Sequence, residues 1–420
     1  MAFTDSFRTL KERNAKLFFS GLLVSNIGTW AQATATTLLV QRLAKTDPGT
    51  ALGIALALQF LPTLFLGAWA GAFADQHSKW TLTVSTQALL LAQALALAIV
   101  DFSGSATLPL VYGLALVMGF INAVDNPARR GLVLELVEQS EISSAMSLNT
   151  GVMTGSRVFG PALAAWMVIE WGTAWCFLVN AVSFLAVLAS LLLLDRSKLH
   201  ESPRASRGGT PVRDGFRLVW HHPVLKPMFV LFVIVSTFAF NYAVALPLLA
   251  DDRFHSTSMY GILLAVVSVG SLTGSLISAA QKRIRMRWLI GSSALLGAFM
   301  TAMSWAPNPA VAYILAVPMG IFGAIVVTAA NSISQEYTPP VMRGRMLALT
   351  GTAFLGSTPI GSPITGWIGD HISAEWSLAY GGVISFIAAV CTLAVFRRRS
   401  GAPALADDGA FPVPTEVVAS

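Results

Sequence analysis

The chain contains many apolar runs of about 20 residues or more, most of them free of charged side chains. Two of them, residues 51–73 and 80–100, are separated only by a short polar stretch. A helix of about 20 apolar residues spans the ~30 Å hydrocarbon core of a bilayer. Backbone polar groups in lipid must be satisfied internally, so such runs have to be helical. The sequence therefore predicts an all-α polytopic membrane protein.

The composition agrees with a membrane protein. Hydrophobic residues make up 55% of the chain and charged residues 11%, with a mean hydropathy of +0.66; soluble domains have about 25% charged residues. The net charge is +6, but the cations lie in short loops between apolar runs, so we expect a lipid bilayer and no nucleic acid as partner.

Several chemical functions have no support in the sequence. Cys176 and Cys391 both lie inside apolar runs, and the histidines lack metal-ligand spacing, so we expect no metal site. No Gly-x-x-x-x-Gly-Lys-Ser/Thr motif is present, which argues against ATP hydrolysis and against a bound cofactor. We find no convergent catalytic set and expect no enzyme activity.

The charges in the loops predict an orientation. Of the 27 lysines and arginines, 23 fall on one side when the loops are assigned alternately to the two sides of the membrane. The exceptions are Arg42, Lys45 and Arg253 on the other side and Arg157 within a span. By the positive-inside rule the side that carries most of the lysines and arginines is cytoplasmic, and we expect both termini on that side. The twelve predicted spans are 17–43, 51–73, 80–100, 107–127, 145–168, 173–195, 226–249, 258–280, 287–305, 309–331, 345–368 and 375–396.

The spans fall into two halves. We predict a six-helix bundle over residues 1–195, a cytoplasmic linker over 196–223, a second bundle over 224–399 and a disordered tail over 400–420. Within the linker, residues 214–220 predict a short amphipathic helix on the inner membrane surface.

The two halves also resemble each other in sequence. The stretch from Tyr112 to Gly119 matches the stretch from Tyr313 to Gly320, an offset of 201 residues. Gly53-Ile-Ala-Leu-Ala matches Gly261-Ile-Leu-Leu-Ala, an offset of 208. Because the order is kept, the pattern indicates a parallel repeat of a six-helix unit, which some transporters contain.

The polar stretch between the second and third spans has the pattern Gly71-x-x-x-Asp75-x-x-x-Lys79. Gly71 would let another helix approach closely. Asp75 suits a helix N-terminus, where the dipole favours negative charge, and Lys79 is spaced to pair with Asp75 or with lipid headgroups. The spacing alone leaves open a solvated turn with no further role.

This stretch, with the repeat, resembles the major facilitator superfamily over nearly the whole chain. Gln76, Ser78 and Lys79 depart from that superfamily's usual cation, glycine and arginine at these places. The resemblance implies two pseudo-symmetric bundles and a cytoplasmic latch at this loop. On the 208-residue offset Arg283 stands where the first half has Asp75. The predicted latch residues are Gly71, Asp75, Lys79, Arg283, Arg343 and Arg345.

The fifth span has small residues at Ser147, Ser156, Gly160-Pro161 and Ala164-Ala165. A small face permits tight helix packing, and Pro161 removes a backbone donor and allows a bend. The register resembles an antiporter-type exporter motif, although a packing kink alone would explain it. Residues 149–184 and 214–225 resemble the branch that contains enterobactin exporters and macrolide efflux proteins.

Charges inside the membrane are candidates for coupling or gating. Arg157 lies near the middle of a span, where an arginine costs roughly 3 kcal/mol. The nearest acid by helix order is Asp125, so we predict an Asp125–Arg157 pair, with a purely structural arginine as the alternative. Gly160 and Pro161 complete this candidate set.

Polar and aromatic residues in four spans are candidates for a substrate cavity, since an apolar cavity with a few amides suits a bulky amphipathic ligand. Each of them has an alternative role in an interhelical hydrogen bond. They are Asn26, Trp30, Gln32, Asn122, Asn241, Tyr242 and Asn331.

The resemblance implies a monomeric secondary transporter in the bacterial inner membrane that exports a small molecule and is driven by the proton gradient. The residues do not identify the substrate. An importer with the same fold and a non-transporting scaffold remain as alternatives.

Overall fold

The computed structural model describes residues 9–200, 211–256, 259–281, 283–339 and 342–400. Within these residues the ordered elements are helices and no strand is present. The chain forms two compact units. The first comprises the described residues of Met1–Arg207 and Ser256–Ala265, and the second those of Gly208–His255 and Val266–Ser420.

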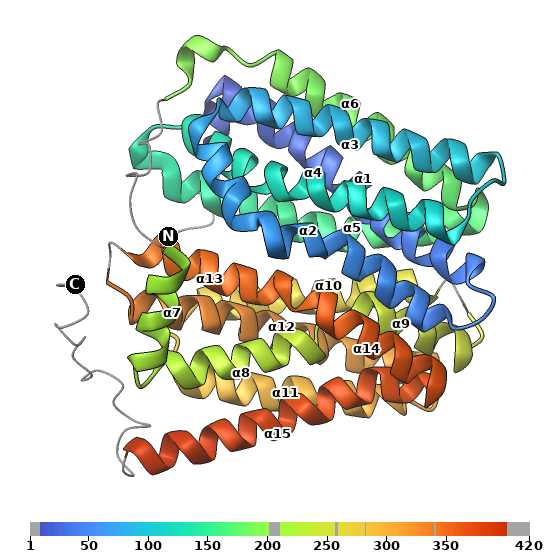
Figure 1. Ribbon diagram of the computed structural model, residues 1–420, viewed down its shortest axis with the longest axis vertical. Coiled ribbons are helices and arrows are strands. Elements are labelled where there is room, and N and C mark those ends of the chain that lie inside the picture. Colours follow the sequence, from blue (N-terminus) through green and yellow to red (C-terminus); the bar gives the residue numbers. More distant parts are fainter. Residues whose placement is uncertain (1–8, 201–210, 257–258, 282, 340–341, 401–420) are drawn as a thin grey trace. The chain divides into compact units, whose positions relative to one another are not determined.

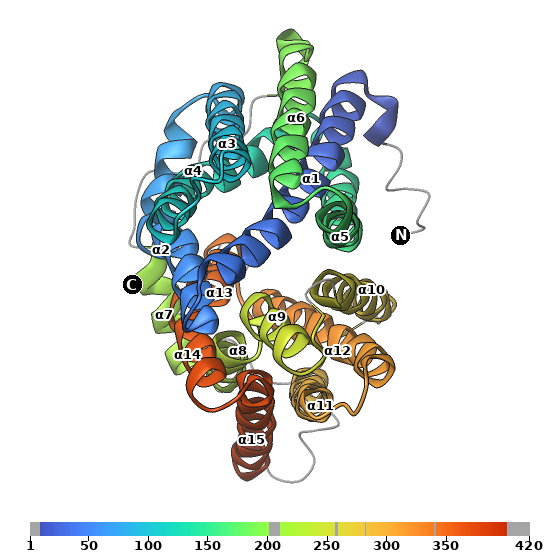
Figure 2. The same ribbon diagram turned by 90° about the vertical axis from the view of Figure 1, so that its right-hand side faces the viewer.

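The described residues of the first unit include six long helices, which form a bundle (Figures 1 and 2). Helix α1 packs on α5 and α6, α2 packs on α4, and α3 packs on α4 and α6. Phe18 and Leu22 of α1 and Phe184 and Leu191 of α6 lie in its buried core. The helices are α1 (Arg13–Leu43), α2 (Pro48–Gln76), α3 (Lys79–Phe102), α4 (Leu108–Glu135), α5 (Ile142–Glu170) and α6 (Thr173–Leu192).

The second unit contains the remaining helices, with the start of α10 assigned to the first unit. Helix α11 packs on α12 and α15, and α8 packs on α13 and α15. The helices are α7 (Pro211–His221), α8 (Leu225–Phe238), α9 (Tyr242–Asp252), α10 (Met259–Ala279), α11 (Met286–Ser304), α12 (Pro309–Glu336), α13 (Arg343–Gly356), α14 (Thr358–His371) and α15 (Ala374–Ser400).

The helices follow the predicted apolar runs. Nine segments of the described chain are long and apolar enough to cross a membrane. Three predicted spans are not among them, 17–43, 287–305 and 345–368. The first contains four threonines, two glutamines and one asparagine. The second corresponds to a 19-residue helix with Arg287 in its first turn. The third is divided at Ser357 into two 14-residue helices.

The segment predicted as an amphipathic helix lies within α7. In it Leu218 and Val219 are buried, whereas Phe216 and Trp220 are exposed. Most of the predicted tail, residues 401–420, lies outside the described residues.

The sequence repeat has a structural counterpart at specific glycines. A Cβ atom on Gly119 of α4 would collide with the carbonyl oxygen of Gln59 in α2. A Cβ atom on Gly320 of α12 would collide in the same way with the carbonyl oxygen of Val267 in α10. Gly119 and Gly320 are 201 residues apart, and Gln59 and Val267 are 208 apart, which are the two offsets of the repeat. The same backbone approach therefore recurs in both units.

Candidate functional site

The loop between α2 and α3 places Asp75 and Lys79 beside each other. Asp75 is exposed and Lys79 is mostly buried, with 3.7 Å between Lys79 Nζ and Asp75 Oδ1. Lys79 Nζ also donates to the carbonyl oxygen of Ala74 at 2.6 Å. The expected helix N-terminal position for Asp75 is wrong, because Asp75 lies in the last turn of α2 and Ser78 caps α3 by accepting from the Thr81 amide.

The close helix approach expected at Gly71 is also absent. No described atom lies within 4 Å of a Cβ built on Gly71. The close contact lies at Gly131 of α4, where a Cβ would stand 3.0 Å from Cδ of Lys79. The buried stem of Lys79 thus occupies the space that a larger residue at position 131 would need. The pattern around Gly71 does not point to Gly131, which is distant in the sequence.

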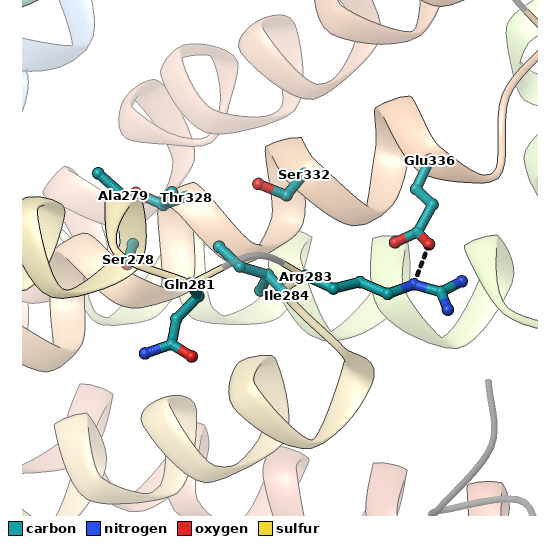
Figure 3. Close-up of a pocket in the computed structure, with 8 residues that line it drawn as sticks. All are labelled: Ser278, Ala279, Gln281, Arg283, Ile284, Thr328, Ser332 and Glu336. Carbon is teal, nitrogen blue, oxygen red and sulfur yellow. Dashed lines mark hydrogen bonds and ion pairs between the residues drawn. The ribbon is translucent and has the colours of Figure 1, made fainter. Parts of the chain in front are cut away.

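In the second unit Arg283 forms an ion pair with Glu336 at the end of α12. The pair borders a pocket of about 500 Å³ between the end of α10 and α12, drawn in Figure 3. Glu336 was not predicted, but it is related by the 201-residue offset to Glu135, which interacts electrostatically with Lys79. Each unit therefore places a cation beside a glutamate: Lys79, which follows the loop between α2 and α3, and Arg283, in the loop between α10 and α11. The pocket is lined by Ser278, Ala279, Gln281, Arg283, Ile284, Thr328, Ser332 and Glu336.

The two other predicted latch arginines lie at the start of α13. Arg343 is exposed, and its Nε donates to the carbonyl oxygen of Thr338 at 3.4 Å. Arg345 is part of the helix, but its side chain lies outside the described part of the structure.

Asp125 of α4 is 1% exposed and accepts from two neighbours on α3. Thr86 Oγ1 and Gln87 Nε2 lie 2.7 and 2.9 Å from Asp125 Oδ1. The guanidinium of Arg129, one helical turn further along α4, lies 3.4 Å from Oδ2. The predicted Asp125–Arg157 pair is therefore wrong, because Arg129 at i+4 already provides the counter-charge.

Arg157 of α5 has a different partner. Its guanidinium carbon lies 5.1 Å from the ring centroid of Trp30 in α1. No carboxylate of the described residues forms an ion pair with it. Near this point a Cβ on Gly160 would collide with Cβ of Trp30. Pro161 follows within α5, which is a single continuous helix here.

The other cavity candidates of the first unit differ in exposure. Asn26 is 5% exposed, and its Oδ1 accepts from Arg129 Nη1 at 3.5 Å. Gln32 is buried and links three helices, since it donates to Gln93 at 3.0 Å and accepts from Asn180 at 2.8 Å. Asn122 is partly exposed. Gln32 thus forms an interhelical bond and does not line an open cavity.

Two of the candidates of the second unit, Asn241 and Tyr242, lie at the break between α8 and α9. Asn241 is buried, donates to the carbonyl oxygen of Thr237 at 2.8 Å and accepts from Ser362 at 3.1 Å. The hydroxyl of Tyr242 is buried and has no hydrogen-bond partner among the described residues. Asn331 of α12 accepts from Thr350 of α13 at 3.2 Å. Asn241 and Asn331 are therefore used in contacts between helices.

Comparison with known families decides the class of protein. A family described as "Transmembrane secretion effector", a major facilitator group, matches residues 4–418. The chain belongs to this family. It is consequently a multi-pass membrane transporter of the major facilitator superfamily and not an enzyme.

Similar proteins in this superfamily move siderophores or drugs. The chain is 25% identical over 360 residues to the staphyloferrin A transporter of Staphylococcus aureus, covering 83% of this chain and 87% of that protein. It is 22% identical to macrolide efflux protein A of Streptococcus pyogenes, covering 83% and 88%. It is 24% identical to the enterobactin exporter EntS of Salmonella typhimurium, covering 71% and 73%.

Solved structures of major facilitator transporters share the fold. The nucleoside transporter NupG has a TM-score of 0.71 at 13% identity, covering 90% of this chain and 99% of that one. A D-xylose-proton symporter has a TM-score of 0.69 at 17% identity, covering 93% and 97%. At these identities the likeness concerns the fold alone.

Proposed function

We propose that this transporter exports a small amphipathic molecule, siderophore-like or drug-like, across the bacterial inner membrane. The observation that carries the proposal is the similarity, over 71–83% of the chain, to relatives named for enterobactin export, macrolide efflux and staphyloferrin A transport. The small-residue face of α5, which meets α1 at Gly160, agrees with the exporter-type motif.

The proposed topology has twelve spans, both termini in the cytoplasm and a monomeric chain. The ion pairs at the proposed outer ends of the helices support this orientation. Arg42 pairs with Asp101, and Arg253 pairs with Glu375 at 2.8 Å. Two of the three outer cations are thus neutralised by carboxylates on their own side, and the excess positive charge lies on the proposed cytoplasmic side.

The proposed mechanism is alternating access coupled to proton antiport. Asp125 is the best candidate to carry the proton, because it is a buried carboxylate within a membrane helix and holds the guanidinium of Arg129. Protonation would remove the negative charge that faces Arg129 and would weaken the link between α3 and α4. Asp75 and Lys79, at the loop between α2 and α3, then serve as the latch of one conformation.

Export is tested in a bacterial host that lacks its own drug and siderophore exporters. Expression of the wild-type chain should raise resistance to a macrolide or increase secretion of a catecholate or carboxylate siderophore. The control is an Asp125→Asn chain, confirmed to be present in the membrane, which should give neither effect. Increased cellular accumulation of these compounds would indicate an importer. No change for any compound in the panel would contradict export and favour a scaffold.

A further inference from the structure

An arginine side chain within the membrane needs a counter-charge or water. Arg157 lies in a segment, Ser144–Glu170, that is apolar and long enough to cross the bilayer. Its side chain is exposed and forms no ion pair with any described carboxylate. Exposure of such a charge to lipid would be unfavourable, so the direction in which it points is informative.

Arg157 and the exposed apolar side chains of α5 lie on opposite faces of the helix. Phe159 and Trp166 are 63% and 49% exposed, which is expected of side chains in contact with acyl chains. Each residue of a helix advances by about 100°, which places Arg157 roughly 160° from Phe159 and about 180° from Trp166. Arg157 is therefore exposed on the face opposite the apolar one. An exposed arginine on that face avoids contact with the acyl chains that Phe159 and Trp166 meet.

The acid predicted to pair with Arg157 is Asp125, and its carboxylate already has other partners. Asp125 accepts from Thr86 and Gln87 and is paired with Arg129. Arg157 thus remains an uncompensated positive charge among the described residues of its unit. A positive charge without a counter-charge favours a negative ligand.

Helix α1 adds two further groups to this place. Trp30 lies under the guanidinium of Arg157 and presents an aromatic face. Asn26, one helical turn earlier on the same face of α1, is 5% exposed, and its Nδ2 has no hydrogen-bond partner. Buried amide donors are nearly always bonded, so a free one is available to an acceptor oxygen.

We infer that Arg157, Trp30 and Asn26 form a subsite for the anionic group of the exported molecule. The guanidinium binds a carboxylate, sulfonate or phenolate oxygen, which its planar fork suits. The Trp30 ring packs against the apolar or aromatic part of the same ligand. The substrate class is an amphipathic anion. The inference rests on the proposed export function and narrows it.

Two matched probes test the charge requirement. 1-Anilinonaphthalene-8-sulfonate and N-phenyl-1-naphthylamine share one aromatic body, and only the first has a negative group. Their binding to the purified protein in phosphatidylcholine nanodiscs is measured by fluorescence, with binding to protein-free discs subtracted. We expect the wild type to bind the anionic probe about tenfold more tightly than the neutral one, a difference typical of one charged contact.

Variants assign this preference to one side chain. Arg157→Gln should abolish the tenfold preference and leave binding of the neutral probe unchanged, whereas Arg157→Lys should retain part of it. Arg196→Gln is the matched control, because Arg196 is also exposed and lies over a tryptophan, Trp80, at 3.2 Å, but outside the membrane-spanning segments.

Two results would overturn the inference: a wild type without preference for the anionic probe, or an Arg157→Gln variant that keeps the preference. The first of these does not depend on any variant folding. Either result would leave export itself standing if the host assay shows efflux of uncharged or cationic compounds. Loss of export for every compound would instead refute the proposed function.

Discussion

Among the described residues, two ion pairs have the same i,i+4 spacing but different surroundings. Asp125 and Arg129 are 1% and 18% exposed in their side chains, whereas Asp75 and Lys79 are 58% and 11% exposed. A buried charge that loses its partner is strongly destabilised, and an exposed pair contributes little. Comparison of the two pairs therefore shows how burial changes the contribution of an ion pair to the free energy of unfolding.

Replacement of Asp125 by Ala should lower the free energy of unfolding by about 3 kcal/mol, because it leaves Arg129 without a counter-charge. The matched change Asp75→Ala should cost less than about 1 kcal/mol. Chemical or thermal unfolding of the two purified variants in one detergent measures the difference. Similar losses for both variants would show that burial of the Asp125 pair is not important for stability.

His222 marks the start of α8, outside the membrane-spanning segments. It is 2% exposed, and its Nδ1 accepts from the amides of Val224 and Leu225 at 3.2 and 3.3 Å. Burial lowers the pKa of His222 below its usual value. The unfolded chain then binds a proton at acidic pH more readily than the folded chain does.

The folded state should consequently lose stability as the pH falls through the usual histidine pKa of about 6.5. Above this pH the histidine is neutral in both states, so it should cause no loss of stability there. In His222→Asn, which keeps an acceptor for the amide of Val224, the drop in melting temperature between about pH 8 and about pH 5.5 should be smaller than in the wild type. The exposed neighbour provides the control, His221→Asn. An unchanged pH dependence in His222→Asn would contradict this role of His222.

At the scale of helices, the apolar runs predicted most elements, because a backbone in lipid has to be helical. The contacts between helices were less predictable, since they depend on which faces meet. The partner of Asp125 was misassigned to α5 although the Asp-x-x-x-Arg spacing of Asp125 and Arg129 was visible in the sequence. The roles of Gly131 and Glu336 depend on contacts between segments that are distant in the chain.

The repeated glycine contacts give a test at this scale. Gly119→Leu and Gly320→Leu should both lower the yield of folded protein, because each added side chain would collide with a backbone carbonyl of the neighbouring helix. Gly113→Leu is the control in the same helix as Gly119, since no described atom lies within 4 Å of a Cβ there. Monodisperse yield after size exclusion measures the effect. Normal yields for Gly119→Leu and Gly320→Leu would refute the tight packing.

The proposed latch between α2 and α3 makes a separate prediction. Asp75 is exposed and contributes little to stability, so Asp75→Asn should insert and fold normally but turn over at least several-fold more slowly. Transport is measured at equal protein content in membranes, with Ser78→Ala as a control for a local change that affects only the cap of α3. Wild-type turnover in Asp75→Asn would show that the loop is only a solvated turn.

At the scale of the whole molecule, the sequence repeat predicted that the halves are related, and the packing of Gly119 on Gln59 and of Gly320 on Val267 repeats between the units. The family could be predicted from the loop pattern around Asp75 and the fifth span, because these motifs are local in sequence. Asn26 and Trp30 were predicted as cavity residues from the sequence. Their proposed grouping with Arg157 was not, because it depends on α1 meeting α5 and on Asp125 pairing with Arg129.

We propose that this chain moves an amphipathic molecule out of the cytoplasm at the expense of a proton gradient. The most direct measurement is uptake of a labelled substrate into everted membrane vesicles, whose interior respiration acidifies, compared with right-side-out vesicles. We expect uptake into everted vesicles that stops when a protonophore is added. Gradient-dependent uptake only into right-side-out vesicles, or no gradient-dependent uptake into either, would contradict it.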